Sequence, residues 1–204
     1  QGVATVTGLG IQAMLLRTGA GPAVSAAYGV GFLIESLAIL PGNAYSGAAA
    51  AFVSQNLGAG NPQRARHAAR TSALQAAAAM CGAAALFAIA APEIARIFFP
   101  KSDPVSIAAH ALVVDYLRTV CWVEPFAAIG IVLSGALNGA GETRIPRTIT
   151  FATMGVRLAL VYLALQAWGF GARGAWAALA ATPVLGAVLT WTAWRKGGWM
   201  TKSV

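Results

Sequence analysis

The chain has 204 residues, of which 58% are hydrophobic and 10% are charged, and its mean hydropathy is +0.68. A soluble domain usually has about a quarter of its residues charged, so this chain has too little polar surface to cover a water-soluble globule. The formal net charge is +8, but most basic residues stand in short gaps between apolar runs, which is typical of a membrane protein and argues against nucleic-acid binding.

Six apolar segments follow one another along the chain, separated by short turns rich in glycine and proline. They cover residues 1–17, 23–57, 63–99, 105–138, 146–168 and 174–194. Since a helix needs about 20 apolar residues to cross a bilayer, the sequence predicts an all-α membrane protein with six transmembrane helices. The first segment is short and the chain begins at Gln1, which favours a sequence cut from within a longer protein.

The second and fourth segments are longer than a straight crossing requires. At 1.5 Å per residue, about 35 helical residues extend roughly 50 Å, against about 30 Å of hydrocarbon. Pro41 lies inside the second segment and Pro125 inside the fourth, and each removes one backbone hydrogen bond. We therefore expect a kink in each helix, which serves either packing or gating.

Basic residues in the gaps and at the adjoining span ends predict the orientation of the helices, because cytoplasmic loops carry an excess of lysine and arginine. Alternate gaps divide these residues into two groups of unequal size. The larger group is Arg64, Arg66, Arg70, Arg144, Arg147, Arg195, Lys196 and Lys202, and the smaller is Arg17, Arg96, Lys101 and Arg173. We expect the larger group, and with it the C-terminus, to face the cytoplasm.

Glu35 is the in-span charge most typical of a functional site. A charge at this depth costs about 2.5–3.5 kcal/mol on insertion scales. Tyr28 precedes it by seven residues and so shares its helix face, and Gly31 between them leaves space for water or a cation. This pattern predicts a site for a proton or Na⁺. The alternative is a glutamate that holds two helices together.

Four other charges lie well inside predicted spans, away from the span ends. Asp115 and Arg118 are three residues apart on one helix and are expected to neutralise each other. Glu124 follows Asp115 by nine residues and would face the opposite side from it on an uninterrupted helix. There it either lines a cavity or has a structural neighbour. Arg157 is too deep to reach water easily and needs a carboxylate or several carbonyls. Glu124 and Glu35 are both candidate partners. Its role is either a tether or a substrate contact.

The sequence contains no G-x-S-x-G, H-E-x-x-H or Walker A motif, each of which would indicate an enzyme or a nucleotide-binding site. The two cysteines, Cys81 and Cys121, stand in apolar stretches without ligand spacing and are interpreted as small buried hydrophobes. We therefore expect a protein that is not an enzyme and needs no cofactor or metal cluster.

Three segments carry a resemblance to a known family. AAFVSQNLGAGNPQRAR (50–66), VLSGALNGAGETRIP (132–146) and GVRLALVYLAL (155–165) resemble, in this order, the segment after the eighth span, the connection of the tenth and eleventh spans, and the eleventh span of the multidrug and toxic compound extrusion (MATE) family. The two Gly-Ala-Gly loops also resemble each other, and their glycines are expected to form tight turns. The stretch YGVGFLIESLA (28–38) looks closest to the DinF-like bacterial branch.

The resemblance implies that the chain forms spans seven to twelve, the C-terminal lobe of a twelve-helix transporter whose N-terminal lobe is absent here. The family has two six-helix lobes around a central cavity in the bacterial inner membrane and exchanges cationic drugs for H⁺ or Na⁺. Glu35 then falls in the eighth span, and Arg157 matches an arginine common in the eleventh. Together with Tyr28 and Glu124, these residues are the expected ion-coupling or cavity site, with Na⁺ near Glu35 as one reading.

The chain departs from the sodium-coupled members at two places. Residues 1–17 contain no acidic residue in the seventh span, and Ala127 stands where those members carry an aspartate in the tenth, nearly one turn from Glu124. Two other functions stay open: a flippase of lipid-linked oligosaccharides or polysaccharides from the same superfamily, for which more cavity cations are expected, and a membrane scaffold subunit without transport. The in-span charges argue against a purely apolar scaffold.

Overall fold

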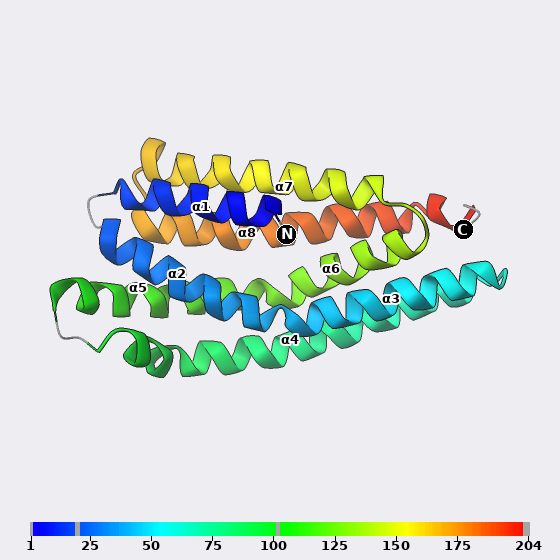
Figure 1. The fold of residues 1–204 in the computed structure, drawn as a ribbon, viewed down its shortest axis with the longest axis horizontal. Coiled ribbons are helices and arrows are strands. Elements are labelled where there is room, and N and C mark those ends of the chain that lie inside the picture. The colour runs from blue at the N-terminus through cyan, green and yellow to red at the C-terminus, as the bar shows by residue number, and fades with distance from the viewer. Residues whose placement is uncertain (1, 19–20, 101–102, 202–204) are drawn as a thin grey trace. The chain divides into compact units, whose positions relative to one another are not determined.

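The computed structural model describes residues 2–18, 21–100 and 103–201, and this part of the chain is almost entirely helical, with no strand in it. The α-helices are α1 (Gly2–Leu16), α2 (Gly21–Ala38), α3 (Leu40–Gly58), α4 (Pro62–Phe98), α5 (Pro104–Val120), α6 (Glu124–Gly139), α7 (Arg144–Tyr162) and α8 (Gly171–Arg195) (Figure 1). Short 3-10 turns follow α5 (Cys121–Val123) and α8 (Gly198–Thr201), and a π turn (Leu163–Ala167) extends α7.

Five helical stretches in the described residues are long and apolar enough to cross a membrane. They are Gly21–Gly58, Pro62–Phe98, Pro104–Gly139, Arg144–Ala167 and Gly171–Arg195, and the apolar part of α1, Val6–Leu16, is shorter. Large apolar side chains also face outward, as on α4, where Leu86, Ile89 and Ile97 are 62–80% exposed. Such a surface suits lipid rather than water, so the predicted all-α membrane fold is confirmed.

Two of these stretches are broken near their middle, as the prolines predict. The first break separates α2 from α3, and Pro41 stands in the first turn of α3. The second is the 3-10 turn Cys121–Val123 between α5 and α6, and Pro125 stands in the first turn of α6. Since a first-turn residue has no intrahelical N–H bond to lose, proline is tolerated there.

The helices divide into two compact units, each with its own apolar core. The first unit comprises Gln1–Leu37, Ala83–Trp122 and Met154–Thr182, and the second comprises Ala38–Gly82, Val123–Thr153 and Pro183–Val204. Two of the boundaries lie beside the helix breaks and a third at Pro183 inside α8. The largest fully buried side chains of the first core are Trp176, Tyr116, Ile11 and Leu15.

In the second unit, α3 and α6 approach so closely that a side chain would not fit between them. A Cβ atom built on Gly135 would overlap the backbone of Ser46, and one built on Gly139 would overlap the backbone of Ala50. The Ser46 hydroxyl also donates a hydrogen bond of 3.0 Å to the carbonyl of Ile131. Small residues and interhelical hydrogen bonds are the usual basis of helix association in lipid.

The two Gly-Ala-Gly turns have the same backbone structure, which confirms the predicted tight turns. Gly60 (φ 71°) and Gly141 (φ 75°) occupy the left-handed region. The amide that follows each glycine donates to a carbonyl five residues earlier, Asn61 to Asn56 at 2.8 Å and Glu142 to Leu137 at 2.9 Å. This is the glycine C-cap of the Schellman motif. It ends α3 and α6 with equivalent turns, after which α4 and α7 begin.

Candidate ion-coupling site

Glu35 lies in the last turn of α2, where its carboxylate meets two other polar side chains of the first unit. The Tyr116 hydroxyl of α5 donates a hydrogen bond of 2.6 Å to Glu35 Oε2. On the other side, Arg157 Nη2 of α7 lies 3.6 Å from Glu35 Oε1. The carboxylate therefore stands between a phenol and a guanidinium group, and both side chains of the ion pair are at most 21% exposed.

Arg157 is held more loosely than Glu35. Its Nη2 lies 3.6 Å from the carboxylate and 3.5 Å from the carbonyl of Leu179 on α8, whereas strong N–H···O bonds are 2.7–3.2 Å long. Its buried Nε has no hydrogen-bond partner among the residues that the structure describes. Charge rather than fixed geometry therefore holds the guanidinium group beside Glu35, and of its two predicted partners the structure pairs it with Glu35.

Tyr116 reaches Glu35 because Gly31 has no side chain. A Cβ atom built on Gly31 would overlap the Tyr116 ring, so the ring fills the space that the sequence suggested for water or a cation. The expectation that Gly31 leaves space for water or a cation was wrong. Gly31 instead allows α5 to bring its phenol against α2, one turn before the glutamate.

Tyr28 belongs to the same group through its ring. It is buried, and its ring centroid lies 6.4 Å from that of Trp176 in a stacked arrangement and 6.3 Å from that of Tyr116. Tyr116 in turn meets Trp176 edge-on at 4.9 Å. Tyr28 and Trp176 thus pack against the ring of Tyr116, whose hydroxyl group donates the hydrogen bond to Glu35.

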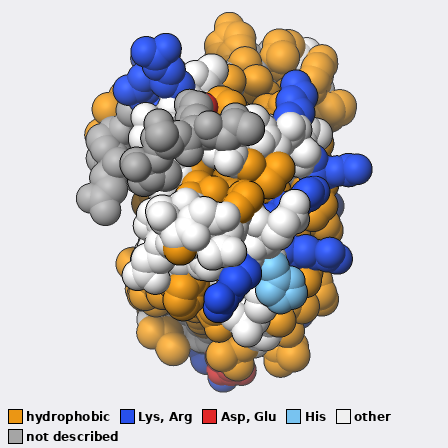
Figure 2. Space-filling view, turned by 90° about the vertical axis from the view of Figure 1, so that its right-hand side faces the viewer, with side chains coloured by type: hydrophobic (Ala, Val, Ile, Leu, Met, Phe, Trp, Pro, Cys, Tyr) orange, Lys and Arg blue, Asp and Glu red, His pale blue; other side chains and the backbone are white. Residues whose placement is uncertain are grey.

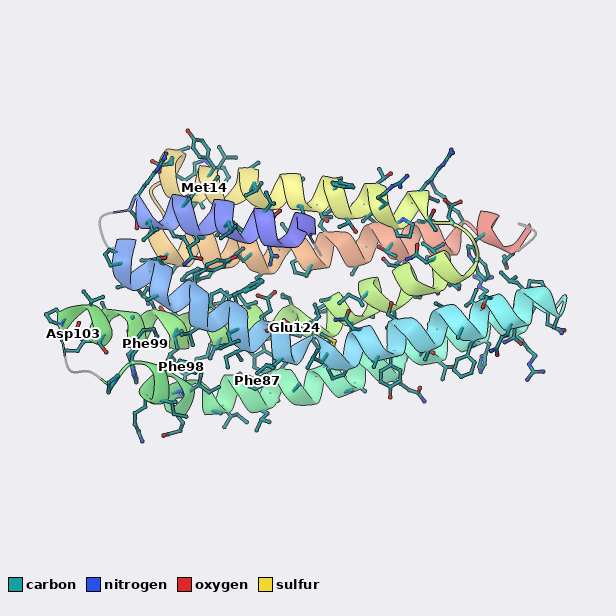
Figure 3. All side chains as sticks on the ribbon, in the orientation of Figure 1. Met14, Phe87, Phe98, Phe99, Asp103 and Glu124 are labelled. Atoms are coloured by element: carbon teal, nitrogen blue, oxygen red, sulfur yellow. The ribbon has the colours of Figure 1, made fainter. Side chains whose placement is uncertain are left out.

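Glu124 belongs to the second unit and is the first residue of α6 (Figure 3). It is buried, with 3% exposed, and its position in the first turn places its carboxylate near the positive end of the helix dipole. The prediction that Glu124 faces the opposite side from Asp115 assumed one uninterrupted helix. Because the helix breaks before Glu124, that assumption does not hold. Its role in a cavity stays a prediction.

The spacing predicted that Asp115 pairs with Arg118. The structure instead pairs Asp115 with a residue of another helix. Arg173 Nε, in the first turn of α8, lies 3.1 Å from Asp115 Oδ2. The side chains are 84% and 40% exposed, and exposed pairs contribute at most about 1 kcal/mol. The pair links α5 to α8 within the first unit without fixing either strongly.

The two groups of basic residues each lie in one unit. Arg64, Arg66, Arg70, Arg144, Arg147, Arg195 and Lys196 of the larger group belong to the second unit, and Arg17, Arg96 and Arg173 of the smaller group belong to the first. Lys101 and Lys202 lie outside the described residues. The expected direction of these charges in the membrane stays a prediction.

Tyr116 is the residue of this site that the sequence did not single out. A buried tyrosine hydroxyl usually finds a hydrogen-bond partner, and Tyr116 stands between two in-span charges, Asp115 and Arg118. That placement was a signal that α5 carries polar groups at depth. It did not identify Glu35 as the partner, since the two residues are 81 positions apart.

Replacing Tyr116 with phenylalanine is expected to lower the thermal unfolding midpoint of the purified full-length protein by several degrees. The change keeps the packed ring and removes a hydrogen bond to a carboxylate, a bond worth about 1.5–3 kcal/mol. The matched control is Tyr162→Phe, because Tyr162 is 53% exposed on α7. Equal midpoints for the two variants would contradict a stabilising bond between Tyr116 and Glu35.

Comparison with curated proteins finds relatives that are longer than this chain. A multidrug resistance protein NorM of Burkholderia vietnamiensis is 34% identical over 178 residues, which are 86% of this chain and 38% of the relative. A multidrug resistance protein PmpM of Pseudomonas aeruginosa is 33% identical over 132 residues, which are 62% of this chain and 27% of the relative. The chain thus spans less than half the length of these relatives.

Solved structures show the same fold. A MATE protein in complex with MaL6 aligns with a TM-score of 0.88 at 17% identity over 98% of this chain and 44% of its own, and the MATE transporter ClbM in complex with Rb⁺ aligns with a TM-score of 0.86 at 21% identity over 99% and 46%. The sequence profile of the MatE family matches residues 2–163. With this match over most of its length, the chain belongs to the MatE family.

Proposed function

We propose that the chain forms one half of a secondary active antiporter that exports organic cations or drugs in exchange for an ion. The observation that carries the proposal is the ion pair of Glu35 and Arg157, largely buried inside membrane-spanning helices. Charges at this depth are rare and usually mark an ion or substrate pathway. The names of the NorM and PmpM relatives support drug export as the task.

We propose H⁺ rather than Na⁺ as the coupling ion. A guanidinium group 3.6 Å from the carboxylate already supplies its positive charge and repels a second cation. A proton can still bind Glu35, and it removes the charge that holds Arg157. Since Arg157 is held mainly by that charge, protonation would release the arginine and change which arrangement of α2 and α7 is favoured.

The length of the relatives supports a proposal for the rest of the transporter. The chain covers about two fifths of the NorM relative, and we propose that the remaining length forms the N-terminal lobe, with the substrate cavity between the lobes. Residues 1–204 alone are then expected not to transport. The proposed location is the bacterial inner membrane, with the larger basic group and the C-terminus in the cytoplasm.

Expression of the full-length protein in a drug-sensitive bacterium tests this function. We expect lower ethidium accumulation than in cells with an empty vector, and we expect an uncoupler to abolish the difference because export depends on the proton gradient. Export that survives the uncoupler but requires external Na⁺ would assign the coupling to Na⁺. Unchanged accumulation of ethidium and norfloxacin would contradict drug export.

A further inference from the structure

The second unit carries a basic surface cavity that no step of the proposed transport uses. Its volume is about 540 Å³, and its lining comes from two helix ends: Gln63, Arg66, His67 and Arg70 of α4, and Trp191, Trp194 and Arg195 of α8. Figure 2 shows a face of the molecule on which Lys and Arg side chains gather together with a His side chain. We call this cavity the basic pocket.

Helix periodicity places the lining residues on one face of α4 and on one face of α8. Gln63, His67 and Arg70 stand at i, i+4 and i+7 of α4, and Trp191 and Arg195 at i and i+4 of α8, so each set lies on one helix face. The α4 residues occupy the first three turns of their helix, and the α8 residues occupy the last two turns of theirs. Two helix faces therefore bring Arg66, Arg70 and Arg195 to the lining of one cavity.

Among the described residues no carboxylate lines the pocket, and its arginines are not in ion pairs with any of them. The ion pairs of the described chain join Glu93 to Arg96, Glu35 to Arg157 and Asp115 to Arg173. Three guanidinium groups around one cavity repel one another, and a bound anion relieves that repulsion. The pocket is thus complementary to an anion such as a phosphate ester.

Tryptophan side chains give the pocket an aromatic wall. Trp194 is buried and stacks on Trp199 with ring centroids 3.9 Å apart, and Trp199 Nε1 donates a hydrogen bond of 3.0 Å to the Trp194 carbonyl. Trp191 remains 38% exposed at the rim. Tryptophan is enriched where hydrocarbon meets headgroups, and here it lies at the end of a membrane-spanning stretch.

We propose that the basic pocket binds the phosphate of an anionic phospholipid headgroup at the membrane surface. Arginine supplies paired N–H donors to phosphate oxygens, and the tryptophan wall packs against the glycerol and upper acyl region. Basic pockets between helices at this level are suited to anionic headgroups. The bound lipid would tie the start of α4 to the end of α8, two segments of the second unit.

The test uses the full-length protein in detergent, titrated with dioleoylphosphatidylglycerol, dioleoylphosphatidylcholine or inorganic phosphate, with binding measured by thermophoresis. We expect phosphatidylglycerol to bind more tightly than the other two. Each basic residue near an anionic headgroup contributes on the order of 1 kcal/mol, so Arg66→Gln with Arg70→Gln should weaken this binding roughly 30-fold.

The matched control is Arg144→Gln with Arg147→Gln, which removes the same charge from the exposed start of α7 outside the pocket. It should retain near wild-type affinity. Equal losses in the two double variants would overturn the pocket in favour of general attraction, and equally tight binding of inorganic phosphate or phosphatidylcholine would overturn a headgroup site. Because the assay needs no transport, it can fail while drug export stands.

Tryptophan fluorescence provides a second readout of the same site. Phosphatidylglycerol with brominated acyl chains is expected to quench part of the wild-type emission, and Trp191→Phe should remove much of that part because Trp191 stands exposed at the rim. Before lipid is added, the thermal unfolding of each variant is compared with that of the wild type to ensure that the variant is folded. Unchanged quenching in Trp191→Phe would contradict a lipid lying against this wall.

Discussion

Replacing Glu35 with glutamine is expected to raise ethidium accumulation to the level of cells that lack the transporter. Glutamine keeps the shape and still accepts the Tyr116 hydrogen bond, but it cannot bind and release a proton. It also leaves Arg157 as a largely buried charge without its partner, which typically costs about 3–5 kcal/mol. Accumulation is measured in the drug-sensitive strain, with protein levels in the membrane determined in parallel.

The control is Glu93→Gln, which removes a carboxylate of the same kind from an exposed pair. Glu93 lies 2.8 Å from Arg96 on α4, and its side chain is 62% exposed, so its loss should leave export unchanged. Export at wild-type level by Glu35→Gln would contradict a coupling role for Glu35.

A double variant separates stability from coupling at the same pair. Glu35→Gln with Arg157→Gln removes both charges, so no unpaired charge is left inside the protein. We expect it to recover the amount of folded protein that Glu35→Gln loses, and to remain inactive in export. Active export by the double variant would show that the pair is a structural tether, the alternative reading of Glu35.

Replacing Gly139 with alanine is expected to disrupt the second unit. The added Cβ would overlap the Ala50 backbone of α3, and backbone atoms, unlike a side chain, can yield only if α3 and α6 separate. Overpacking costs about 1–3 kcal/mol, and occasionally more, so we expect a cost at or above the upper end of this range. Unfolding by added SDS and the monodispersity of the purified protein measure the loss.

Gly82→Ala is the matched control, because a Cβ atom on Gly82 of α4 meets nothing within 4 Å. Alanine is the better helix former by about 1 kcal/mol, so this variant should be as stable as the wild type or slightly more stable. Equal destabilisation by the two changes would contradict the close packing of α3 on α6.

The sequence could predict the helices and their breaks, because these depend on local chemistry. Apolar run length gives the spans, and the proline ring decides where a long helix restarts, as Pro41 and Pro125 show. The tight turns at Gly60 and Gly141 were predictable for the same reason, since glycine adopts positive φ without strain. Each of these features needs only a few neighbouring residues.

Contacts between helices could not be predicted in the same way. Lipid and protein interior are both apolar, so hydropathy does not show which helix face meets another helix. Arg157 was expected to need a carboxylate or several carbonyls, and Glu35 and Glu124 were equal candidates until the fold placed Glu35 and the Leu179 carbonyl beside it. Gly31 suggested empty space because its partner, Tyr116, comes from a distant part of the chain.

Proton release on substrate binding tests the coupling role of Glu35 most directly. In weakly buffered detergent solution, addition of ethidium to the full-length protein is followed with a pH-sensitive dye at a pH where transport is active. We expect the wild type and Glu93→Gln to release protons and Glu35→Gln to release none. Proton release by Glu35→Gln equal to that of the wild type would contradict Glu35 as the group that exchanges the proton.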